Sequence, residues 1–258
     1  MSEQSSSDDI SARVERLLTA QPSAPPESRR VRRSCLIEER WNEGRRYVGL
    51  KLRVDDEFCA AYRRPGQYVT LKVDGWPPRF YVVAARPEPN CWEFLVDRRG
   101  EIGPEIARLQ EGDDLLVSLP EGMGFDPVEA AGEAAALFCT GSGVATMRPL
   151  VEWWLDDEKM RPAAISLYYG EREGGDFAYE SLLERWSGEG VQVHRAVETQ
   201  ASEQFPHRYV QHAYRAEPPE TNDTELYAYL SGAPVMIQIV AETLLNEGVP
   251  PSRVKVNI

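Results

Sequence analysis

A glycine-rich turn, GSG at 141–143, follows the apolar run 134–139 and precedes a stretch with helical periodicity. Small residues let the backbone approach a bulky anion, and free N–H groups at the start of the next helix favour a pyrophosphate there. An ordinary strand-to-helix turn has the same pattern, so the turn alone is weak support for a nucleotide site. Gly170 and Gly232 end two further apolar runs in the same way. Because ligands of parallel sheets bind at the carboxyl ends of the strands, the three endings together predict a nucleotide site.

The chain offers few residues for nucleophilic, acid–base or metal chemistry. Ser142 lacks the GxSxG spacing of a nucleophile turn and has no evident histidine partner. The histidines are not spaced as metal ligands: His194, His207 and His212. The cysteines are widely separated and form no CxxC pair: Cys35, Cys59, Cys91 and Cys139. We therefore expect no metal or iron–sulfur site, a structural role for His194, and buried free thiols.

The elements that would position the glycine turn change character along the chain. Residues 31–128 contain six short runs rich in β-branched and aromatic residues, separated by turn signals. The expected strands are 31–39, 46–54, 67–73, 79–85, 91–97 and 114–119. One helical turn, near 104–109, interrupts them. This pattern predicts a six-stranded antiparallel β-barrel.

Residues 132–258 alternate strand and helix instead. Strands are expected at 134–139, 163–169, 191–197 and 226–231 and in the final VKVNI. Helices are expected at 144–157, 177–186, 207–215 and 235–246. The alternation predicts a five-stranded parallel sheet covered on both faces. The fold class is therefore a two-domain protein, with the barrel first and the α/β domain second.

Composition restricts the partners and the location. The chain is 42% hydrophobic and 28% charged, as in soluble globular proteins, and no apolar run approaches the roughly 20 residues of a membrane span. The polar, acidic N-terminus is unlike a signal peptide, so we expect a cytoplasmic protein. The net charge of −13 argues against nucleic acid and anionic membranes as partners.

Residues 1–30 have the composition of a flexible, acidic tail that closes on a proline-bearing linker. Within the tail, Ile10, Val14, Leu17 and Leu18 share one face of a short helix. Two outcomes are open for this helix. It docks on the rest of the chain, or it frays in solvent.

Residues 31–258 contain six motifs in this order: PGQYV (65–69), RFYVV (79–83), LPEGMGF (119–125), TGSGVATMRPL (140–150), YYGER (168–172) and SGAPVM (231–236). Several such motifs across two domains make these residues similar to the ferredoxin–NADP reductase superfamily. The TGSG and LYYG motifs resemble those of a branch of stand-alone reductase-like proteins that includes a plant fruit protein. The resemblance implies FAD held by the barrel, 31–128, and a nicotinamide nucleotide held by the α/β domain, 132–258.

The resemblance assigns a set of residues to the flavin site: Arg79, Phe80, Tyr81, Val82, Val83, Gly100, Gly103 and Phe125. Arg79 would pair with a flavin phosphate, as suits a planar and always charged guanidinium, and Tyr81 would lie against the ring. The backbone of 82–83 would approach the ring edge, and the helix start at 100–103 would lie over the pyrophosphate. The alternative for 79–83 is an ordinary strand of alternating exposure. Phe125 either flanks the flavin or plugs the domain interface.

A second set is assigned to the nicotinamide nucleotide: Thr140, Gly141, Ser142, Gly143, Val144, Tyr169, Gly170, Arg172 and Gly232. Residues 140–144 would wrap the pyrophosphate, and 169–172 would border the ribose and phosphates. Arg172 is equally suited to a surface ion pair with Glu171, Glu173 or Asp176.

Two positions depart from the family pattern. Val82 stands where relatives usually have a Ser or Thr that hydrogen-bonds flavin N5, which valine cannot do. Ser231 stands where many relatives have a cysteine against the nicotinamide, and it is the catalytic candidate of this chain. Both departures predict slow turnover. They also leave open a non-catalytic nucleotide-binding or regulatory module that has retained the reductase fold.

The residues after the third strand of the α/β domain bear on the choice of nucleotide. They are AVETQ, with Glu198 and no adjacent cation. A carboxylate repels a 2′-phosphate but accepts a hydrogen bond from a ribose hydroxyl, which favours NADH. Arg208 could still reach in from the next helix, so NADPH stays open.

The expected activity is hydride transfer from NADH or NADPH to FAD, with electrons passed on to a separate redox protein or small acceptor. Such chemistry needs two stacked rings and little proton transfer by the protein. A further alternative is an electron-transfer subunit of a larger complex. The acidic chain would oppose an acidic redox partner unless a local basic face forms. The candidates for that face are Arg29, Arg30, Arg32, Arg33, Arg63 and Arg64.

Overall fold

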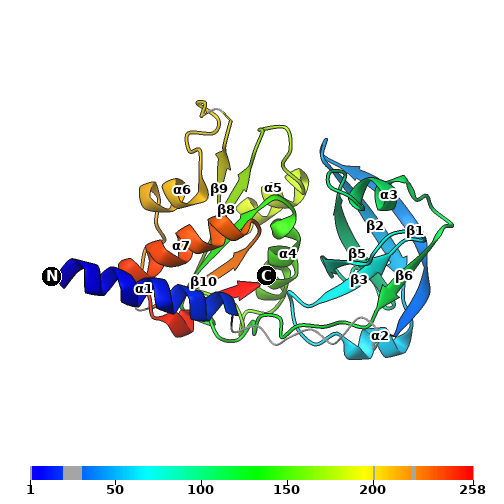
Figure 1. The fold of residues 1–258 in the computed structure, drawn as a ribbon, viewed down its shortest axis with the longest axis horizontal. Coiled ribbons are helices and arrows are strands. Elements are labelled where there is room, and N and C mark those ends of the chain that lie inside the picture. Colours follow the sequence, from blue (N-terminus) through cyan, green and yellow to red (C-terminus); the bar gives the residue numbers. More distant parts are fainter. Residues whose placement is uncertain (1, 20–30, 200, 222–224, 258) are drawn as a thin grey trace.

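The computed structural model describes residues 2–19, 31–199, 201–221 and 225–257. They form two domains that lie side by side (Figure 1). The expected proline-bearing linker, 21–28, lies outside the described residues.

The first domain is built on a six-stranded antiparallel sheet with the order β4-β3-β6-β1-β2-β5. Its strands are β1 (Arg32–Glu43), β2 (Tyr47–Arg53), β3 (Tyr68–Lys72), β4 (Arg79–Val82), β5 (Cys91–Asp97) and β6 (Asp114–Ser118). Two short helices, α2 (Asp56–Ala61) and α3 (Gly103–Arg108), accompany them. Just beyond β4, Ala84 and Ala85 exchange backbone hydrogen bonds with Glu93 of β5, so the first and last strands of the sheet meet. The predicted barrel is confirmed.

The second domain is a five-stranded parallel sheet with the order β11-β10-β7-β8-β9. Its strands are β7 (Ala134–Thr140), β8 (Ala164–Glu171), β9 (Val191–Val197), β10 (Leu226–Ser231) and β11 (Val254–Asn257). Its helices are α4 (Val144–Asp156), α5 (Glu180–Gly188), α6 (Val210–Ala216) and α7 (Pro234–Asn246), with 3₁₀ turns η2 (Gly141–Gly143) and η4 (Pro251–Arg253). Helices α4 and α5 pack on one face, and α6 and α7 pack on the other (Figure 1). The predicted sheet is confirmed.

The N-terminal helix docks rather than fraying. Helix α1 (Ser2–Thr19) is longer than expected, and its Val14 is buried against the core that α7 covers. Ile10, Leu17 and Leu18 pack partly buried against the same core.

Other differences from the expected elements have local causes. Helix α2 was not expected, because it is only six residues long; the Asp55 side chain caps it by accepting from the Phe58 N–H at 3.0 Å. Helix α5 begins at Glu180 instead of 177, because Tyr179 has a left-handed backbone (φ +62°) that cannot continue a helix.

The two domains share one apolar core. Tyr47 and Leu95 of the barrel pack in the same buried cluster as Leu150 of α4, on the side of the sheet that faces the barrel (Figure 1). At the rim of this core, Arg148 of α4 reaches Glu93 of the barrel with an Nη1–Oε2 distance of 2.7 Å. The relative placement of the domains is therefore fixed by buried apolar contact together with a largely buried ion pair.

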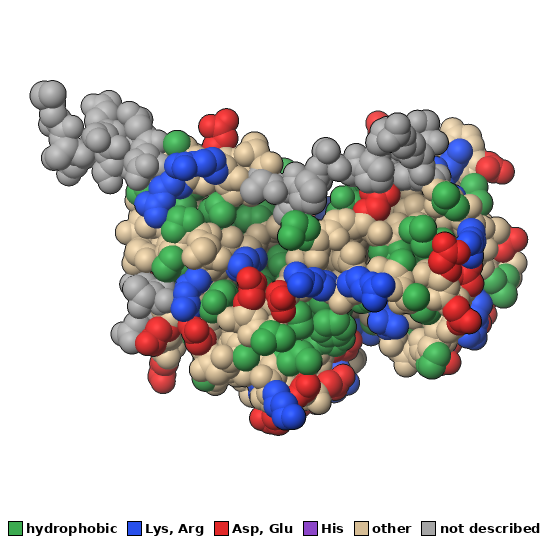
Figure 2. Space-filling model, turned by 90° about the horizontal axis from the view of Figure 1, so that it is seen from below, with side chains coloured by type: hydrophobic (Ala, Val, Ile, Leu, Met, Phe, Trp, Pro, Cys, Tyr) green, Lys and Arg blue, Asp and Glu red, His purple; other side chains and the backbone are tan. Residues whose placement is uncertain are grey.

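The surface carries both signs of charge. Figure 2 shows one face on which Lys and Arg side chains are interspersed with Asp and Glu side chains. Of the expected basic face, Arg33 pairs with Asp55 and Glu57, and Arg64 pairs with Asp126 at 3.2 Å. These two arginines are thus neutralised by neighbours. Arg29 and Arg30 lie outside the described residues.

The cysteines are free thiols, as expected, and three are buried: Cys35, Cys91 and Cys139. Cys59, in α2, is partly exposed. Within the described ranges, no helix combines the length and apolar character that crossing a membrane requires.

Candidate functional site

A cavity of about 1490 Å³ lies where the barrel meets the parallel sheet. The barrel lines it with β4 and the segment that leads into α3, and the sheet lines it with the carboxyl ends of β7, β8 and β10. Pockets for drug-sized ligands have volumes of roughly 300–1,000 Å³. This cavity therefore has room for more than one ligand of that size.

Most of the residues assigned from the sequence line this one cavity. They are Arg79, Phe80, Tyr81, Val82, Gly100, Gly103, Thr140, Gly141, Ser142, Gly143, Gly170, Arg172, Ser231 and Gly232. Residues from five separate segments, 79–82, 100–103, 140–143, 170–172 and 231–232, are thus brought together from both domains.

Four assigned residues do not line the cavity. Val83 and Val144 are fully buried, and the N–H of Val83 donates to the Gln67 carbonyl at 3.1 Å. Phe125 packs edge-on against Tyr229, with ring centroids 5.1 Å apart, and so plugs the domain interface. Tyr169 is buried, and its hydroxyl donates to Glu171 at 2.8 Å. These four side chains support the walls of the site from behind.

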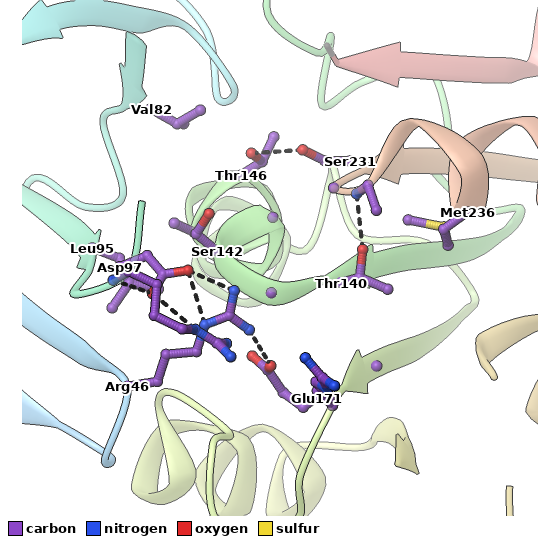
Figure 3. A pocket seen from close by; sticks show the side chains of 18 of the residues that line it. Arg46, Val82, Leu95, Asp97, Thr140, Ser142, Thr146, Glu171, Ser231 and Met236 are labelled. Carbon is purple, nitrogen blue, oxygen red and sulfur yellow. Dashed lines mark hydrogen bonds and ion pairs between the residues drawn. The ribbon is translucent and has the colours of Figure 1, made fainter. Parts of the chain in front are cut away.

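The glycine turn is pressed against the loop that follows β10. A Cβ on Gly143 would lie 2.4 Å from the Ser231 carbonyl oxygen, and one on Gly232 would lie 2.4 Å from Thr140 Oγ1. The Thr140 hydroxyl also accepts from the Ala233 N–H at 2.9 Å (Figure 3). Only glycine permits this approach, which leaves a floor of bare backbone suited to an anionic ligand.

Ser231 has a partner that the sequence did not reveal. Its Oγ donates to Thr146 Oγ1 at 3.0 Å, and both side chains are nearly buried at the cavity wall (Figure 3). Thr146 lies in the first turn of α4, where helical periodicity gave no reason to single it out. The pair fixes the direction of the Ser231 hydroxyl. On the barrel side, Val82 contributes only methyl groups to the lining.

The barrel side of the cavity combines cations, bare backbone and aromatic rings. Arg79 pairs with Glu101 at 2.8 Å on the exposed rim. Gly100 has φ +85° and open space around it, so its backbone is accessible to a phosphate. Phe80 and Tyr68 form an edge-to-face pair with centroids 5.1 Å apart. Burial raises the pKa of Tyr81 to about 12, so its hydroxyl stays protonated at neutral pH. This donor set fits a flavin nucleotide, with cationic and backbone groups for phosphate and rings for an aromatic system.

An ionic network that the sequence did not predict joins the domains at the cavity wall. Arg46, in the turn between β1 and β2, donates from Nη1 to Glu171 Oε2 at 2.7 Å and from Nε to Asp97 Oδ2 at 2.9 Å (Figure 3). The Glu171 side chain, at the end of β8, is completely shielded from solvent. Its Oε1 accepts from the Tyr47 hydroxyl at 2.6 Å and from the Tyr169 hydroxyl. Burial raises the pKa of the Glu171 carboxyl above its ordinary value.

The part of the cavity beside the end of β9 carries the groups expected to distinguish NADH from NADPH. Glu198, just after β9, is exposed at the cavity, and Arg208 donates from Nε to the Glu198 carbonyl at 2.9 Å. The Arg208 guanidinium lies 5.7 Å from the centroid of the Tyr209 ring. Arg172 also lines the cavity and forms no ion pair within the ranges that the structure describes. The alternative surface pair with Glu171, Glu173 or Asp176 is not formed there; Glu171 pairs with Arg46 and Asp176 with Arg99.

Known proteins share this architecture. Residues 137–242 match the family described as oxidoreductase NAD-binding domain. A sulfhydrogenase 2 subunit gamma from Pyrococcus furiosus is 25% identical over 205 residues, which cover 74% of this chain and 70% of that protein.

Two solved structures extend the likeness to both domains. The ferredoxin reductase in carbazole 1,9a-dioxygenase superposes with a TM-score of 0.72 at 22% identity, covering 92% of this chain and 70% of its own. A ferredoxin NADP+ reductase from Neisseria gonorrhoeae with bound FAD and NADP gives 0.70 at 16% identity, covering 87% of this chain and 97% of its own. At these identities the two structures establish the fold.

The contact between the two loops can be tested with Gly143→Ala. The added Cβ would meet the Ser231 carbonyl, so we expect the free energy of unfolding to fall by about 1–3 kcal/mol. Gly188→Ala is the matched control, because a Cβ there meets nothing within 4 Å at the end of α5. It should leave stability unchanged or raise it by about 0.4–1 kcal/mol. Urea unfolding measures both, and equal effects of the two variants would contradict the close approach.

The burial of Glu171 predicts a pH-dependent stability difference. Between the ordinary carboxyl pKa and the raised pKa of the folded state, the folded protein keeps a proton on Glu171 that the unfolded chain has lost, so this group lowers the free energy of unfolding as pH rises through that window. Glu171→Gln cannot titrate. We expect the stability of the variant minus that of the wild type to increase from pH 4.5 to pH 7 in urea titrations. A difference that decreases over this range would contradict the raised pKa.

Proposed function

We propose that this chain, which has the two-domain fold of the ferredoxin–NADP reductase-like superfamily, is a flavin-dependent oxidoreductase. It would take hydride from NADH or NADPH onto FAD and pass electrons to a separate acceptor. The observation that carries the proposal is that Arg79 of the barrel and Gly141 of the sheet line the same cavity. Two sites on unconnected surfaces could not bring a flavin ring and a nicotinamide ring together.

The barrel residues would bind and orient the flavin. Arg79 would exchange its exposed partner Glu101 for a phosphate, and the open backbone at Gly100 would donate to the same group. Tyr81 and Phe80 would contact the ring system from the strand that carries Arg79. A bound flavin would supply the hydride acceptor and the route for single electrons. Because Val82 has no hydroxyl, hydrogen bonding at the ring edge would fall to backbone N–H groups or water.

The sheet residues would bind the nicotinamide nucleotide. The turn 141–143 would hold the pyrophosphate, and Ser231 would lie against the nicotinamide with its hydroxyl held by Thr146. Serine keeps the small volume that close ring approach requires. It has no thiol, so any assistance that a cysteine gives to hydride transfer would be lost.

One relative favours a second form of the same activity. The sulfhydrogenase subunit gamma is by its name one subunit of a larger enzyme, and the matched region covers 70% of it. This chain could accordingly act as the electron-transfer subunit of a complex, receiving electrons from the nicotinamide nucleotide and delivering them to a partner subunit.

Flavin content and its reduction test the proposal. The absorbance of purified or FAD-reconstituted protein should correspond to about one bound flavin per chain. Anaerobic addition of NADH or NADPH should bleach this flavin absorbance. Arg79→Gln should weaken FAD binding at least about tenfold through loss of a charge-assisted phosphate contact. Arg108→Gln is the control, because Arg108 is exposed in α3, does not line the cavity and pairs with its neighbour Glu105.

Two results would contradict the proposal. Protein that binds neither FAD nor FMN would exclude a flavoenzyme. Protein that binds flavin but is not reduced by either nucleotide would favour the non-catalytic module instead.

Glu198 leads us to propose NADH as the preferred donor. Its exposed carboxylate lies at the cavity, where it would repel a 2′-phosphate and accept from a ribose hydroxyl. Stopped-flow reduction should favour NADH over NADPH at least about tenfold, and Glu198→Gln should reduce that ratio by a similar factor. Glu184→Gln, an exposed change on α5 away from the cavity, is the control. Faster reduction by NADPH in the wild type would reverse the assignment.

A further inference from the structure

We propose that Arg46, which belongs to the barrel, binds the pyrophosphate of the nicotinamide nucleotide held on the parallel sheet. The inference rests on the proposed function and adds to it a phosphate ligand from the opposite domain. No sequence motif pointed to Arg46, which lies in the turn between β1 and β2.

The position of the guanidinium is the first observation. Arg46 lines the cavity together with the glycine turn. A Cβ built on Gly141 would lie 3.6 Å from Arg46 Nη2 and 3.7 Å from Nη1. The two terminal nitrogens therefore face the turn on which a pyrophosphate would rest, across a gap that a methyl group on Gly141 would fill.

The hydrogen-bonding capacity of the guanidinium is the second observation. Arginine has five N–H donors, one on Nε and two on each terminal nitrogen. Three are used, two toward Asp97 and one toward Glu171. Among contacts of the described residues, one N–H on Nη1 and one on Nη2 are left over, and these are the nitrogens closest to Gly141. A phosphate oxygen on the turn would be within reach of this pair, and two parallel donors suit phosphate geometry.

The side chain is also held in place before any ligand arrives. Only 19% of the Arg46 side chain is exposed, and its guanidinium lies 5.0 Å from the centroid of the Tyr47 ring. Asp97 and Glu171 hold it from two directions in the plane of the group (Figure 3). Little side-chain freedom would be lost on binding, so the contact would contribute more than that of a mobile surface arginine.

The carboxylates beside Arg46 determine how their substitution should change nucleotide binding. Asp97 and Glu171 fix Arg46, and they also place negative charge behind it. Neutralising Glu171 with glutamine would retain a side chain that accepts from Tyr47 and Tyr169, while removing charge that opposes a pyrophosphate. A phosphate ligand and a purely structural ion pair therefore respond differently to this change. If Arg46 is a phosphate ligand, the Glu171→Gln variant binds the nucleotide as well as the wild type or better. If the ion pair is purely structural, the variant loses the domain placement on which binding depends.

The test measures binding by calorimetry on the flavin-loaded full chain, with NAD+, which cannot reduce the flavin, and with ADP-ribose as probes. ADP-ribose carries the pyrophosphate and has no nicotinamide, so equal effects on both probes assign the contact to the phosphates. Arg46→Gln should weaken both probes at least about tenfold. Glu171→Gln should leave their dissociation constants unchanged or lower them. Arg46→Lys should fall between wild type and Arg46→Gln, because an ammonium keeps the charge and loses the paired donors.

Three results would overturn the inference. They are unchanged affinity in Arg46→Gln, comparable weakening in Arg46→Gln and Glu171→Gln, or weakening of NAD+ binding without weakening of ADP-ribose binding. Arg108→Gln controls for loss of surface charge. If Arg46→Gln does not fold, Arg46→Lys and Glu171→Gln decide by the same criteria. Wild-type protein that binds flavin but neither probe would instead refute the proposed function, so the two failures are distinguishable.

Discussion

The site depends on one constraint, which is the fixed placement of the barrel against the parallel sheet. Each domain contributes an arginine to a glutamate of the other, Arg46 to Glu171 and Arg148 to Glu93, around a shared apolar core. Burying charge is costly unless the groups are paired and hydrogen-bonded, and Glu171 receives hydrogen bonds from one arginine and two tyrosines. With this satisfied network in the wall, the cavity can lie at the seam without leaving a buried charge unpaired.

Within that frame the chemistry of the cavity is divided between the domains. The sheet supplies bare backbone, because the loops after β7 and β10 touch through glycines and exclude side chains. The barrel supplies cations and rings from β4 and from the turn that carries Arg46. The chain as a whole has a net charge of −13, yet arginines line this cavity from both domains. Local charge, rather than the total, therefore governs which ligands the cavity attracts.

The sequence predicted what depends on local pattern. Strand and helix periodicity gave both sheets, and the glycine turn could be placed at a strand end because strand ends in a parallel sheet converge. The Arg46–Glu171 pair could not be predicted, since 125 residues separate its members and strand periodicity does not indicate which residues of two domains meet. Thr146 is hidden in an ordinary helical turn. From the sequence, Phe125 could flank the flavin or plug the domain interface. It plugs the interface because its ring packs against Tyr229, a residue distant in sequence.

The docking of α1 has a consequence for how copies of this protein behave in concentrated solution. The parallel sheet has two outer strands, β11 and β9, and an unprotected outer strand can recruit a strand from another molecule. Helix α1 lies against β11, and a bridge from His207 to Ala196 extends the sheet beside the end of β9. The β11 side is thus contacted by a helix that precedes the sheet in sequence, and the end of β9 by the segment that connects β9 to β10. By lying against β11, the N-terminal helix restricts the space that a strand of another molecule would need to pair there.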